Sequence, residues 1–337
     1  MERISAQTES MEPMCDSGKR TVLVYFPELN SSHREAIRAA AERNGFEAVF
    51  CDGGTEARFA AARAEVMLTA SPALAENAPL LRWLCTHSAG INQFSNTEAF
   101  LSGRAILSNS SGAYGVTIAE HIIMVTLEML RRQQEYNQIV SARKWRRDLP
   151  IRAIRGSRIT LLGTGDIGRE TACRLKAFAP DSITGVNRSG VNRDECFDRV
   201  LRQDRLDEAL PETDLLIISL PGTPETAHMM DASRLSLLPD GALVVNVGRG
   251  AVIDQDALEK ELRAGRLMAA LDVFEREPLP QDVPLWTCPH LLITPHCAGN
   301  TTLPYTVERI VALFLEDFER YCAGRPLARQ VDMKKGY

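Results

Sequence analysis

RITLLGTGDIG, residues 158–168, joins an apolar run to a glycine-rich loop, and a segment with helical character follows over 169–178. Strand, G-x-G-x-x-G and helix in this order are the context that a dinucleotide-binding turn requires. The glycines allow a tight turn, close approach of backbone N–H groups to a pyrophosphate, and close packing of helix on strand. The helix N-terminus adds a field that favours phosphate. We therefore predict a dinucleotide on Gly163, Thr164, Gly165, Asp166, Ile167 and Gly168. A purely structural glycine turn is the alternative.

The end of the following strand indicates which dinucleotide is preferred. An acidic residue at this position bonds the ribose 2′-hydroxyl of NAD. This chain has Asn187, Arg188 and Ser189 there. No carboxylate in this tripeptide repels a 2′-phosphate, and the Arg188 guanidinium offers a fork of donors for one. We predict that these residues bind NADP(H) in preference, with NAD(H) also possible. In the alternative, Arg188 points into solvent and NAD binds without discrimination.

Apolar runs alternate with helix-like segments on both sides of this loop. Such alternation predicts parallel sheets covered by helices. Before the loop, strands are expected over 21–26, 64–70, 81–86 and 105–107, with a serine-capped helix over 31–44. From the loop onward, strands are expected over 158–162, 182–186, 215–220, 242–247, 268–273 and 291–294, with a helix over 255–264 capped by Asp254. A long helix starting near Val116 and running into 131–139 separates the two sets, and another follows residue 301.

The length and composition favour a globular protein of about two domains. The chain has 337 residues, of which 45% are hydrophobic and 25% charged, and its net charge is −5. This charge gives no general reason to expect nucleic acid or an anionic membrane as partner. No apolar run approaches the roughly 18 residues that a membrane span needs. The basic cluster at 143–147 is local, and we interpret it as a solvated helix end or a dimer contact.

The first residues and the cysteines favour a cytoplasmic location. Residues 1–20 are polar and lack the features of a secretory signal, so we expect them to form a loose leader. The eight cysteines contain no C-x-x-C pair and no paired spacing. In a chain of this length the pattern favours reduced thiols over a disulfide framework, and it predicts no metal site.

An arginine, a carboxylate and a histidine each follow a predicted strand of the second set. They are Arg249, Glu277 and His296. Ligands of doubly wound sheets bind beyond the carboxyl ends of the strands, so we expect these side chains to converge. Arg249 can bind a substrate carboxylate, His296 can protonate a carbonyl oxygen, and Glu277 can hold the imidazole in its donor form. The set is typical of 2-keto acid reduction. Each residue alone has a structural alternative, such as pinning its own loop.

The chain resembles the D-isomer-specific 2-hydroxyacid dehydrogenase family from about residue 21 onward. The matching stretches are LGTGDIG at 162–168, LPGTPET at 220–226, NVGRGAVI at 246–253, LDVFEREPLP at 271–280 and ITPHCAG at 293–299. The resemblance implies an α/β fold of two doubly wound domains. A Rossmann cofactor domain, residues 111–301, would be inserted in a flavodoxin-like substrate domain formed by 21–110 and 302–337. Members of the family are usually homodimers, and the helix near Val116 would belong to the interface.

The same resemblance implies a role for individual residues. Catalysis would rest on Arg249, Glu277 and His296. The substrate carboxylate would be bound by Arg249 with Ser88, Ala89 and Gly90. Further cofactor contacts would come from Leu220, Pro221, Thr226, Val247, Gly248, Asp272, His296 and Gly299. The chain departs from NAD-linked members at Asn187 and Arg188, and the roles of His87 and Tyr114 stay open.

We conclude that the sequence predicts an NADPH-preferring reductase that converts a small 2-keto acid, such as glyoxylate or hydroxypyruvate, to a D-2-hydroxy acid. Two alternatives stay open. One is a corepressor-like binding module of the same fold that senses dinucleotides, because a fold alone does not determine function. The other is the same chemistry on a bulky aryl or branched keto acid.

Overall fold

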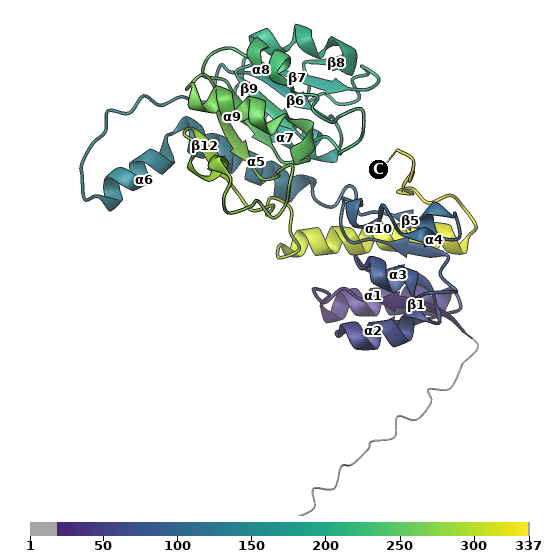
Figure 1. The fold of residues 1–337 in the computed structure, drawn as a ribbon. Helices are drawn as coiled ribbons and strands as arrows, with labels where there is room; N and C mark the ends of the chain where they lie inside the picture. Colours follow the sequence, from purple (N-terminus) through teal and green to yellow (C-terminus); the bar gives the residue numbers. More distant parts are fainter. Residues whose placement is uncertain (1–18, 336–337) are drawn as a thin grey trace, which may run out of the picture.

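The first of two parallel sheets is built from the N-terminal part of the chain (Figure 1). The computed structural model describes residues 19–335. The strands are β1 Arg20–Val24, β2 Phe46–Phe50, β3 Ala64–Leu68, β4 Trp83–Cys85 and β5 Ile106–Ser108. They lie in the order β2-β1-β3-β4-β5, which is the flavodoxin-like order. Side chains alternate between the two faces: Val22 and Val24 join one core cluster, whereas Leu23 joins another.

The second sheet has seven parallel strands in the order β12-β11-β10-β9-β6-β7-β8. The strands are β6 Arg158–Leu162, β7 Ser182–Asn187, β8 Arg199–Arg202, β9 Leu215–Ile218, β10 Leu243–Asn246, β11 Met268–Leu271 and β12 Leu291–Ile293. The order reverses between β6 and β9, which is the topological switch point of a Rossmann sheet. The predicted fold class, α/β with a Rossmann and a flavodoxin-like sheet, is confirmed.

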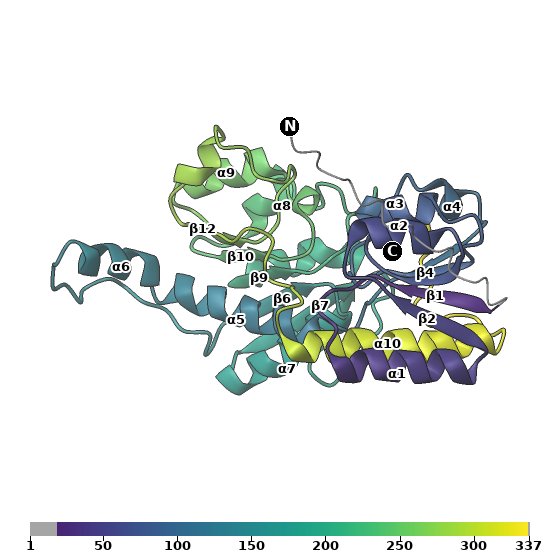
Figure 2. The ribbon, with the colours of Figure 1, turned by 90° about the horizontal axis from the view of Figure 1, so that it is seen from below.

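Helices cover both faces of both sheets (Figure 2). Around the first sheet, α1 lies on one face with α10, and the other face carries α2, α3 and α4. Around the second, α5 and α7 lie on one face and α8 and α9 on the other. The bounds are α1 Ser31–Arg43, α2 Gly54–Ala61, α3 Pro72–Glu76, α4 Glu98–Leu101, α5 Gly115–Leu130, α6 Gln133–Ser141, α7 Asp166–Leu175, α8 Ala232–Leu237, α9 Gln255–Arg263 and α10 Pro304–Cys322.

The C-terminal helix brings the chain back to the first sheet. Trp83 of β4 stacks on Phe314 of α10 with 5.3 Å between ring centroids, and Phe46 of β2 meets Phe318 edge to face. Further along, the Val331 amide donates to the Leu107 carbonyl. These aromatic contacts fix the segment after the second sheet on the same core as the first strands.

Three local features differ from the sequence-based expectation. The long helix ends at Leu130, because Arg132 adopts a left-handed backbone (φ 57°), and α6 then starts in a new direction. The cap of α1 is Asn30, whose side chain accepts the His33 amide, and not a serine. Arg20, which we assigned to the leader, is the first residue of β1. Residues 1–18 of the predicted leader and 336–337 lie outside the described residues.

Within residues 19–335, the structure has no helix that is both long enough and apolar enough to cross a membrane.

Candidate active site

The glycine-rich loop connects the end of β6 to the start of α7. Gly163 has a left-handed backbone (φ 103°), and its amide donates to the Val186 carbonyl over 2.9 Å. A Cβ on Gly168 would lie 2.0 Å from the Gly163 carbonyl oxygen, so helix and turn pack at a distance that only glycine permits. Gly165 is the residue that precedes α7, and no described atom lies within 4 Å of the position its Cβ would take. The loop therefore leaves room for a ligand at the helix N-terminus.

A cavity of about 400 Å³ lies beside this turn, at the end of β7. Its lining combines two arginines with hydroxyl, amide and apolar groups: Thr164, Gly165, Asn187, Arg188, Ser189, Asn192, Arg193, Asp194, Phe197 and Val200. The Asn187 amide holds the two walls together by donating to the Thr164 hydroxyl over 2.9 Å. Cationic and hydroxyl donors next to a helix N-terminus fit the adenosine phosphate end of a dinucleotide.

One carboxylate in this lining was missed by the sequence reasoning. Asp194 lies seven residues beyond the end of β7, but the loop returns it to the cavity wall. One carboxylate oxygen accepts the Cys196 amide over 2.9 Å, and the other lies 3.9 Å from Nε of Arg169. These partners offset part of its charge near the proposed phosphate position.

Asp166 of the glycine-rich loop faces the neighbouring helix. It is not among the described residues that line the cavity, and its carboxylate lies against Gly115 at the start of α5. Burial raises the pKa of Asp166, and the Gly115 backbone N–H partly offsets this shift. Its position indicates that it helps to dock α7 on α5.

The predicted proton donor and its carboxylate are in direct contact. Nδ1 of His296 lies 2.6 Å from Oε2 of Glu277, and the other Glu277 oxygen accepts the Phe274 amide over 2.9 Å. Half of the His296 side chain is exposed, so Nε2 can be reached by a ligand. Glu277 fixes the ring through Nδ1, which leaves the opposite nitrogen to exchange a proton with a substrate.

Asp272 organises the loop that carries His296. Its first oxygen accepts the Thr294 hydroxyl over 2.6 Å and the Cys297 amide over 2.9 Å, and its second accepts the Ala298 amide over 3.0 Å. The Asp272 carbonyl accepts the His296 amide, although His296 has a left-handed backbone (φ 53°). Such a backbone is costly for a histidine and needs this support. The buried Asp272 therefore positions the loop that carries His296, a role that the family resemblance did not imply.

His121 of α5 completes this network and was not found from the sequence. Its Nε2 lies 3.3 Å from the Thr294 hydroxyl and 4.0 Å from the Asp272 carboxylate. Burial lowers the pKa of His121, and the Asp272 charge opposes that shift. The apolar periodicity of the helix gave no signal for this contact, because a histidine on a buried face is usually structural.

Arg249 reaches from the second sheet to the predicted substrate loop of the first. Its Nε donates to the Asn92 side chain over 3.2 Å, and Nη1 donates to the Gly248 carbonyl over 2.6 Å. A Cβ on Gly90 would lie 1.9 Å from Nη2 of Arg249, so the guanidinium rests directly on the Gly90 backbone. Burial lowers the pKa of Arg249, and the Glu277 charge opposes that shift. The structure thus brings Arg249 to both the predicted substrate loop and the predicted catalytic carboxylate.

The substrate loop itself is held by hydrogen bonds on several sides. The Ser88 amide and hydroxyl both contact the Thr86 hydroxyl, at 3.3 and 2.9 Å. Asn109 donates to the Ala89 carbonyl over 2.9 Å. The Ser88 amide is therefore already engaged by Thr86.

His87 and Tyr114 hold the start of this loop through a ring contact and a hydrogen bond. The His87 ring stacks on Phe26 at 4.4 Å, and the Tyr114 hydroxyl donates to the His87 carbonyl over 2.6 Å. Burial lowers the pKa of His87 and raises that of Tyr114. Tyr114 directly precedes α5, so it links the loop to the helix of the other sheet.

The remaining predicted cofactor residues lie in loops after β9, β10 and β12. The Thr226 hydroxyl donates to the Pro221 carbonyl over 2.7 Å and so closes its own turn. A Cβ on Gly248 would lie 2.5 Å from the carbonyl oxygen of Leu220, so the two loops touch. These placements leave the predicted contacts at Leu220, Pro221, Thr226, Val247, Gly248 and Gly299 as predictions.

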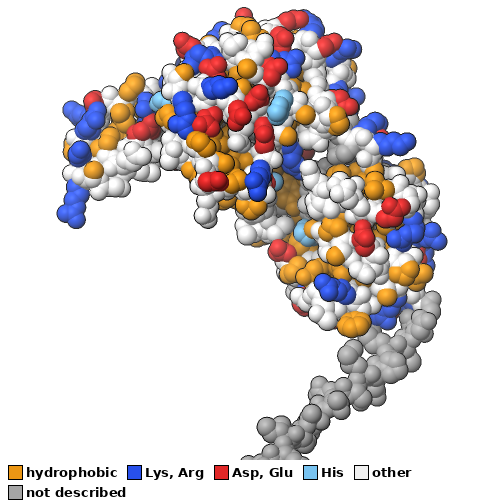
Figure 3. Space-filling view, in the orientation of Figure 1, with side chains coloured by type: hydrophobic (Ala, Val, Ile, Leu, Met, Phe, Trp, Pro, Cys, Tyr) orange, Lys and Arg blue, Asp and Glu red, His pale blue; other side chains and the backbone are white. Residues whose placement is uncertain are grey.

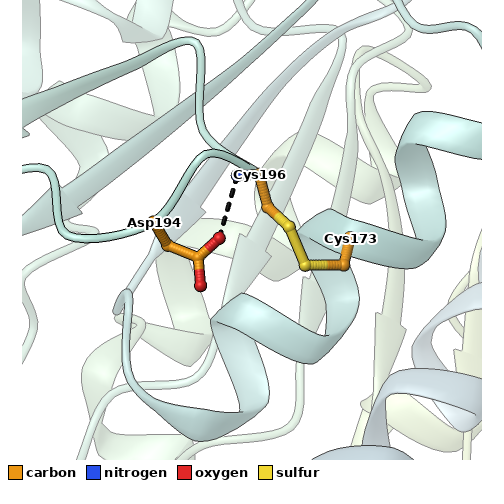
Figure 4. A group of neighbouring side chains, drawn as sticks. All are labelled: Cys173, Asp194 and Cys196. Atoms are coloured by element: carbon orange, nitrogen blue, oxygen red, sulfur yellow. Dashed lines mark hydrogen bonds between the residues drawn. A yellow bond between two sulfur atoms is a disulfide. The ribbon is translucent and has the colours of Figure 1, made fainter.

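The expectation that the thiols are all reduced is wrong for one pair. Cys173 of α7 and Cys196 of the loop after β7 form a disulfide (Figure 4). Their sequence separation is 23 residues, and no local pattern marks it. The other cysteines in residues 19–335 are free: Cys51, Cys85, Cys288, Cys297 and Cys322.

Comparison with known proteins gives a consistent picture. Residues 123–298 match the model described as D-isomer specific 2-hydroxyacid dehydrogenase, NAD binding domain. Glyoxylate/hydroxypyruvate reductase B of Pectobacterium atrosepticum is 34% identical over 232 residues, which are 67% of this chain and 72% of that protein.

Two solved structures resemble the whole chain. A D-isomer specific 2-hydroxyacid dehydrogenase family protein from Aeromonas salmonicida has a TM-score of 0.82 and 32% identity, covering 94% of this chain and 99% of the other. The NADPH-dependent glyoxylate/hydroxypyruvate reductase from Sinorhizobium meliloti, solved with NADP and sulfate, has a TM-score of 0.76 and 25% identity, covering 95% and 100%.

Proposed function

Because the chain belongs to the D-isomer-specific 2-hydroxyacid dehydrogenase family, we propose that it reduces a small 2-keto acid to the D-2-hydroxy acid, preferring NADPH to NADH. The observation that carries this proposal is the convergence of the His296–Glu277 pair with Arg249, which rests on the substrate loop. The Pectobacterium and Sinorhizobium relatives are named glyoxylate/hydroxypyruvate reductases, which supports a small acceptor.

Each side chain of the proposed active site has a separate role in the reaction. Bound reduced nicotinamide supplies a hydride to the keto carbon. The Arg249 guanidinium binds the substrate carboxylate, and its charge polarises the neighbouring carbonyl. Nε2 of His296 donates a proton to the carbonyl oxygen, and Glu277 stabilises the imidazolium at Nδ1 before that transfer. Asp272 holds the loop on which His296 acts.

The cavity at the end of β7 supports the preference for NADPH. Arg188 and Arg193 both line it, and Ser189 adds a hydroxyl. Cations next to a phosphate form charge-assisted hydrogen bonds that a ribose hydroxyl cannot match. The corepressor-like alternative is not favoured, because the two named relatives are reductases.

A panel of 2-keto acids tests the proposed reaction. Loss of reduced-nicotinamide absorbance is followed with glyoxylate, hydroxypyruvate, pyruvate and phenylpyruvate, using NADPH and NADH in parallel. We expect the highest kcat/KM with glyoxylate or hydroxypyruvate and NADPH, and a product of D configuration where the product is chiral. Absence of turnover with every acceptor would contradict the proposal, and a preference for phenylpyruvate would contradict the small acceptor.

We further propose that the chain forms a homodimer through a projecting arm, residues 131–151, which includes α6. None of the described side chains of α6 is buried, and Figure 1 shows this helix extending away from the second sheet. The arm and its flanks expose large hydrophobic side chains: Met124, Val140, Trp145 and Ile151. Figure 3 shows basic and hydrophobic side chains together on this projection. A second copy of the chain, as in the family generally, would cover this apolar surface.

Replacing Val140 by aspartate is expected to convert the dimer to a monomer. Val140 is 69% exposed on α6, and an unpaired charge buried at an apolar interface costs several kcal/mol. Light scattering coupled to size-exclusion chromatography measures the mass. Phe59→Asp is the matched control, since Phe59 is 70% exposed on α2 of the first sheet. A dimeric Val140→Asp protein would contradict the proposed interface.

A further inference from the structure

Figure 4 shows the disulfide between Cys173 and Cys196 with the neighbouring Asp194, a residue that lines the cavity at the end of β7. Its two Cα atoms are 4.9 Å apart, within the usual range for disulfides. Cys173 lies on α7, the helix that starts at the glycine-rich loop. Cys196 lies in the loop between β7 and β8, and its neighbours Asp194 and Phe197 both line the cavity. The bond therefore joins one wall of the cavity to the helix that begins at the opposite wall.

The polar contacts between this loop and α7 are weak. Arg169 of α7 lies 3.9 Å from the Asp194 carboxylate and is about half exposed. Lys176, just after α7, donates to the Glu195 carbonyl and is also partly exposed. Exposed ion pairs of this kind contribute little, because solvent screens them. Phe197, at the far end of the loop, is buried in the same core cluster as Ala172 and Leu175 of α7. The disulfide is thus the covalent tether that holds the part of the loop before Phe197 to the helix.

Internal hydrogen bonds shape the loop but do not anchor it to α7. The Asn192 side chain donates to the Phe197 carbonyl over 3.0 Å and accepts the Asp194 amide over 3.0 Å. The Cys196 amide donates to Asp194 over 2.9 Å. Without the covalent tether, residues 188–195 keep these local contacts and can move relative to the helix, while Phe197 stays in the core.

We propose that Cys173 and Cys196 form a reversible thiol–disulfide site that controls how tightly the adjacent cavity binds the phosphate end of the dinucleotide. This inference rests on the proposed NADPH-dependent function. In the oxidised state the wall bearing Arg188 and Arg193 is tethered before the ligand arrives. A preorganised wall loses less conformational entropy on binding. Reduction releases the loop and weakens binding.

A dithiol is the chemical class of reductant that fits this site. Its thiolate attacks one sulfur, the S–S bond breaks, and a mixed disulfide forms while the other cysteine leaves as a thiolate and takes up a proton. The second thiol of the reductant then displaces the first cysteine as a thiol. Two electrons pass to the pair, and the reductant becomes a disulfide. Both cysteines are half-buried, so a small dithiol can approach them. A disulfide oxidant reverses the reaction.

Cys173, Cys196 and Asp194 are also residue types that bind metal ions, so a metal site is the alternative to a disulfide here. The sulfurs of Cys173 and Cys196 and a carboxylate oxygen of Asp194 all lie within 4.8 Å of one another. In the structure the sulfurs are bonded to each other, so they are not available as thiolate ligands. A preparation that contains zinc bound by these two cysteines, with no disulfide between them, would overturn the disulfide proposal.

The experiment compares the full chain after treatment with oxidised glutathione and after treatment with dithiothreitol, with the reagents removed. Thiol titration under denaturing conditions is expected to count two more thiols in the reduced sample, and peptide mapping to identify the linked pair. We expect NADPH to bind the oxidised protein about tenfold more tightly, as preorganisation predicts. The apo protein is also expected to have a higher Tm when oxidised, because the cross-link restricts the unfolded chain.

Cys173→Ser and Cys196→Ser are each expected to abolish both redox responses. Cys322→Ser is the matched control, because Cys322 is a free, partly buried cysteine on α10 of the other sheet, and its variant should keep them. Equal NADPH affinities in the two states of the wild-type chain would overturn the inference. NADH is titrated in parallel: if both nucleotides bind equally and both respond to oxidation, the NADPH preference fails while the redox site stands.

Discussion

Replacing His296 by alanine is expected to lower the rate of keto-acid reduction by roughly 10²- to 10⁴-fold, the usual contribution of a positioned general acid. NADPH binding should persist, because the proposed phosphate-binding cavity lies at the end of β7 and not at the β12 loop. The reason for the loss is geometric. Glu277 holds Nδ1 at 2.6 Å, so the opposite nitrogen is the donor that the substrate would meet. Single-turnover rates with excess enzyme and NADPH titrations separate the two effects.

His290→Ala is the control for the effect of replacing a histidine that has a left-handed backbone. His290 is exposed and, like His296, has a left-handed backbone (φ 59° against 53°), so both variants change a histidine in the same unusual conformation. The control should keep the wild-type rate. An unchanged single-turnover rate in His296→Ala would exclude this histidine as the proton donor.

Arg188→Ala is expected to weaken NADPH binding by roughly 10- to 100-fold, which corresponds to the loss of one or two charge-assisted hydrogen bonds. NADH binding should change little, because it carries a hydroxyl where NADPH carries a phosphate. Isothermal titration with both nucleotides measures the difference.

Arg205→Ala is the matched control for Arg188→Ala. Arg205 is an exposed arginine in the segment that follows β8, and it pairs with Glu208 at 2.7 Å. It is not among the described residues that line the cavity. Its variant should bind both nucleotides like the wild type. An equal loss of NADPH and NADH affinity in Arg188→Ala would remove the assignment of a 2′-phosphate site.

Interior strands were predicted well, whereas two of the four edge strands were missed. β10 reads LVVN and is buried at all its positions, so it stands out as an apolar run. The missed strands are β2 and β8, with sequences FEAVF and RVLR. Each lies at an edge of its sheet, where partial exposure to water breaks the apolar pattern.

The break between α5 and α6 could not be predicted for a different reason. Arg132 has the left-handed backbone that usually marks a glycine or asparagine, so no residue type signals the turn. The apolar periodicity continues past it to Val140, but that side chain is exposed in the single chain. Apolar periodicity predicts that one face of a helix is buried. It does not show which other surface covers that face.

That the predicted catalytic side chains would lie near one another was easier to predict than their surroundings. Glu277 and His296 each follow a strand of one parallel sheet, and strand ends meet at a common edge. Asp194 and the Cys173–Cys196 pair depend instead on how a long loop folds back, which no local pattern specifies. Asn92 contacts Arg249 across 157 residues of sequence, and such a contact requires the three-dimensional arrangement of both sheets.

Arg249 joins the lobe built on the second sheet to the lobe built on the first through its contacts with Gly90 and Asn92. Its proposed role in substrate binding would therefore couple substrate affinity to the relative placement of the two lobes. The guanidinium that would grip the incoming anion is the same group that bridges the lobes before it arrives. Thermodynamic reciprocity then requires that a ligand which strengthens this bridge favours contact between the lobes. A ligand which competes with Asn92 for the Nε–H of Arg249 favours their separation. Anionic inhibitors of this protein should therefore fall into two classes, distinguishable by the radius of gyration of their complexes in solution.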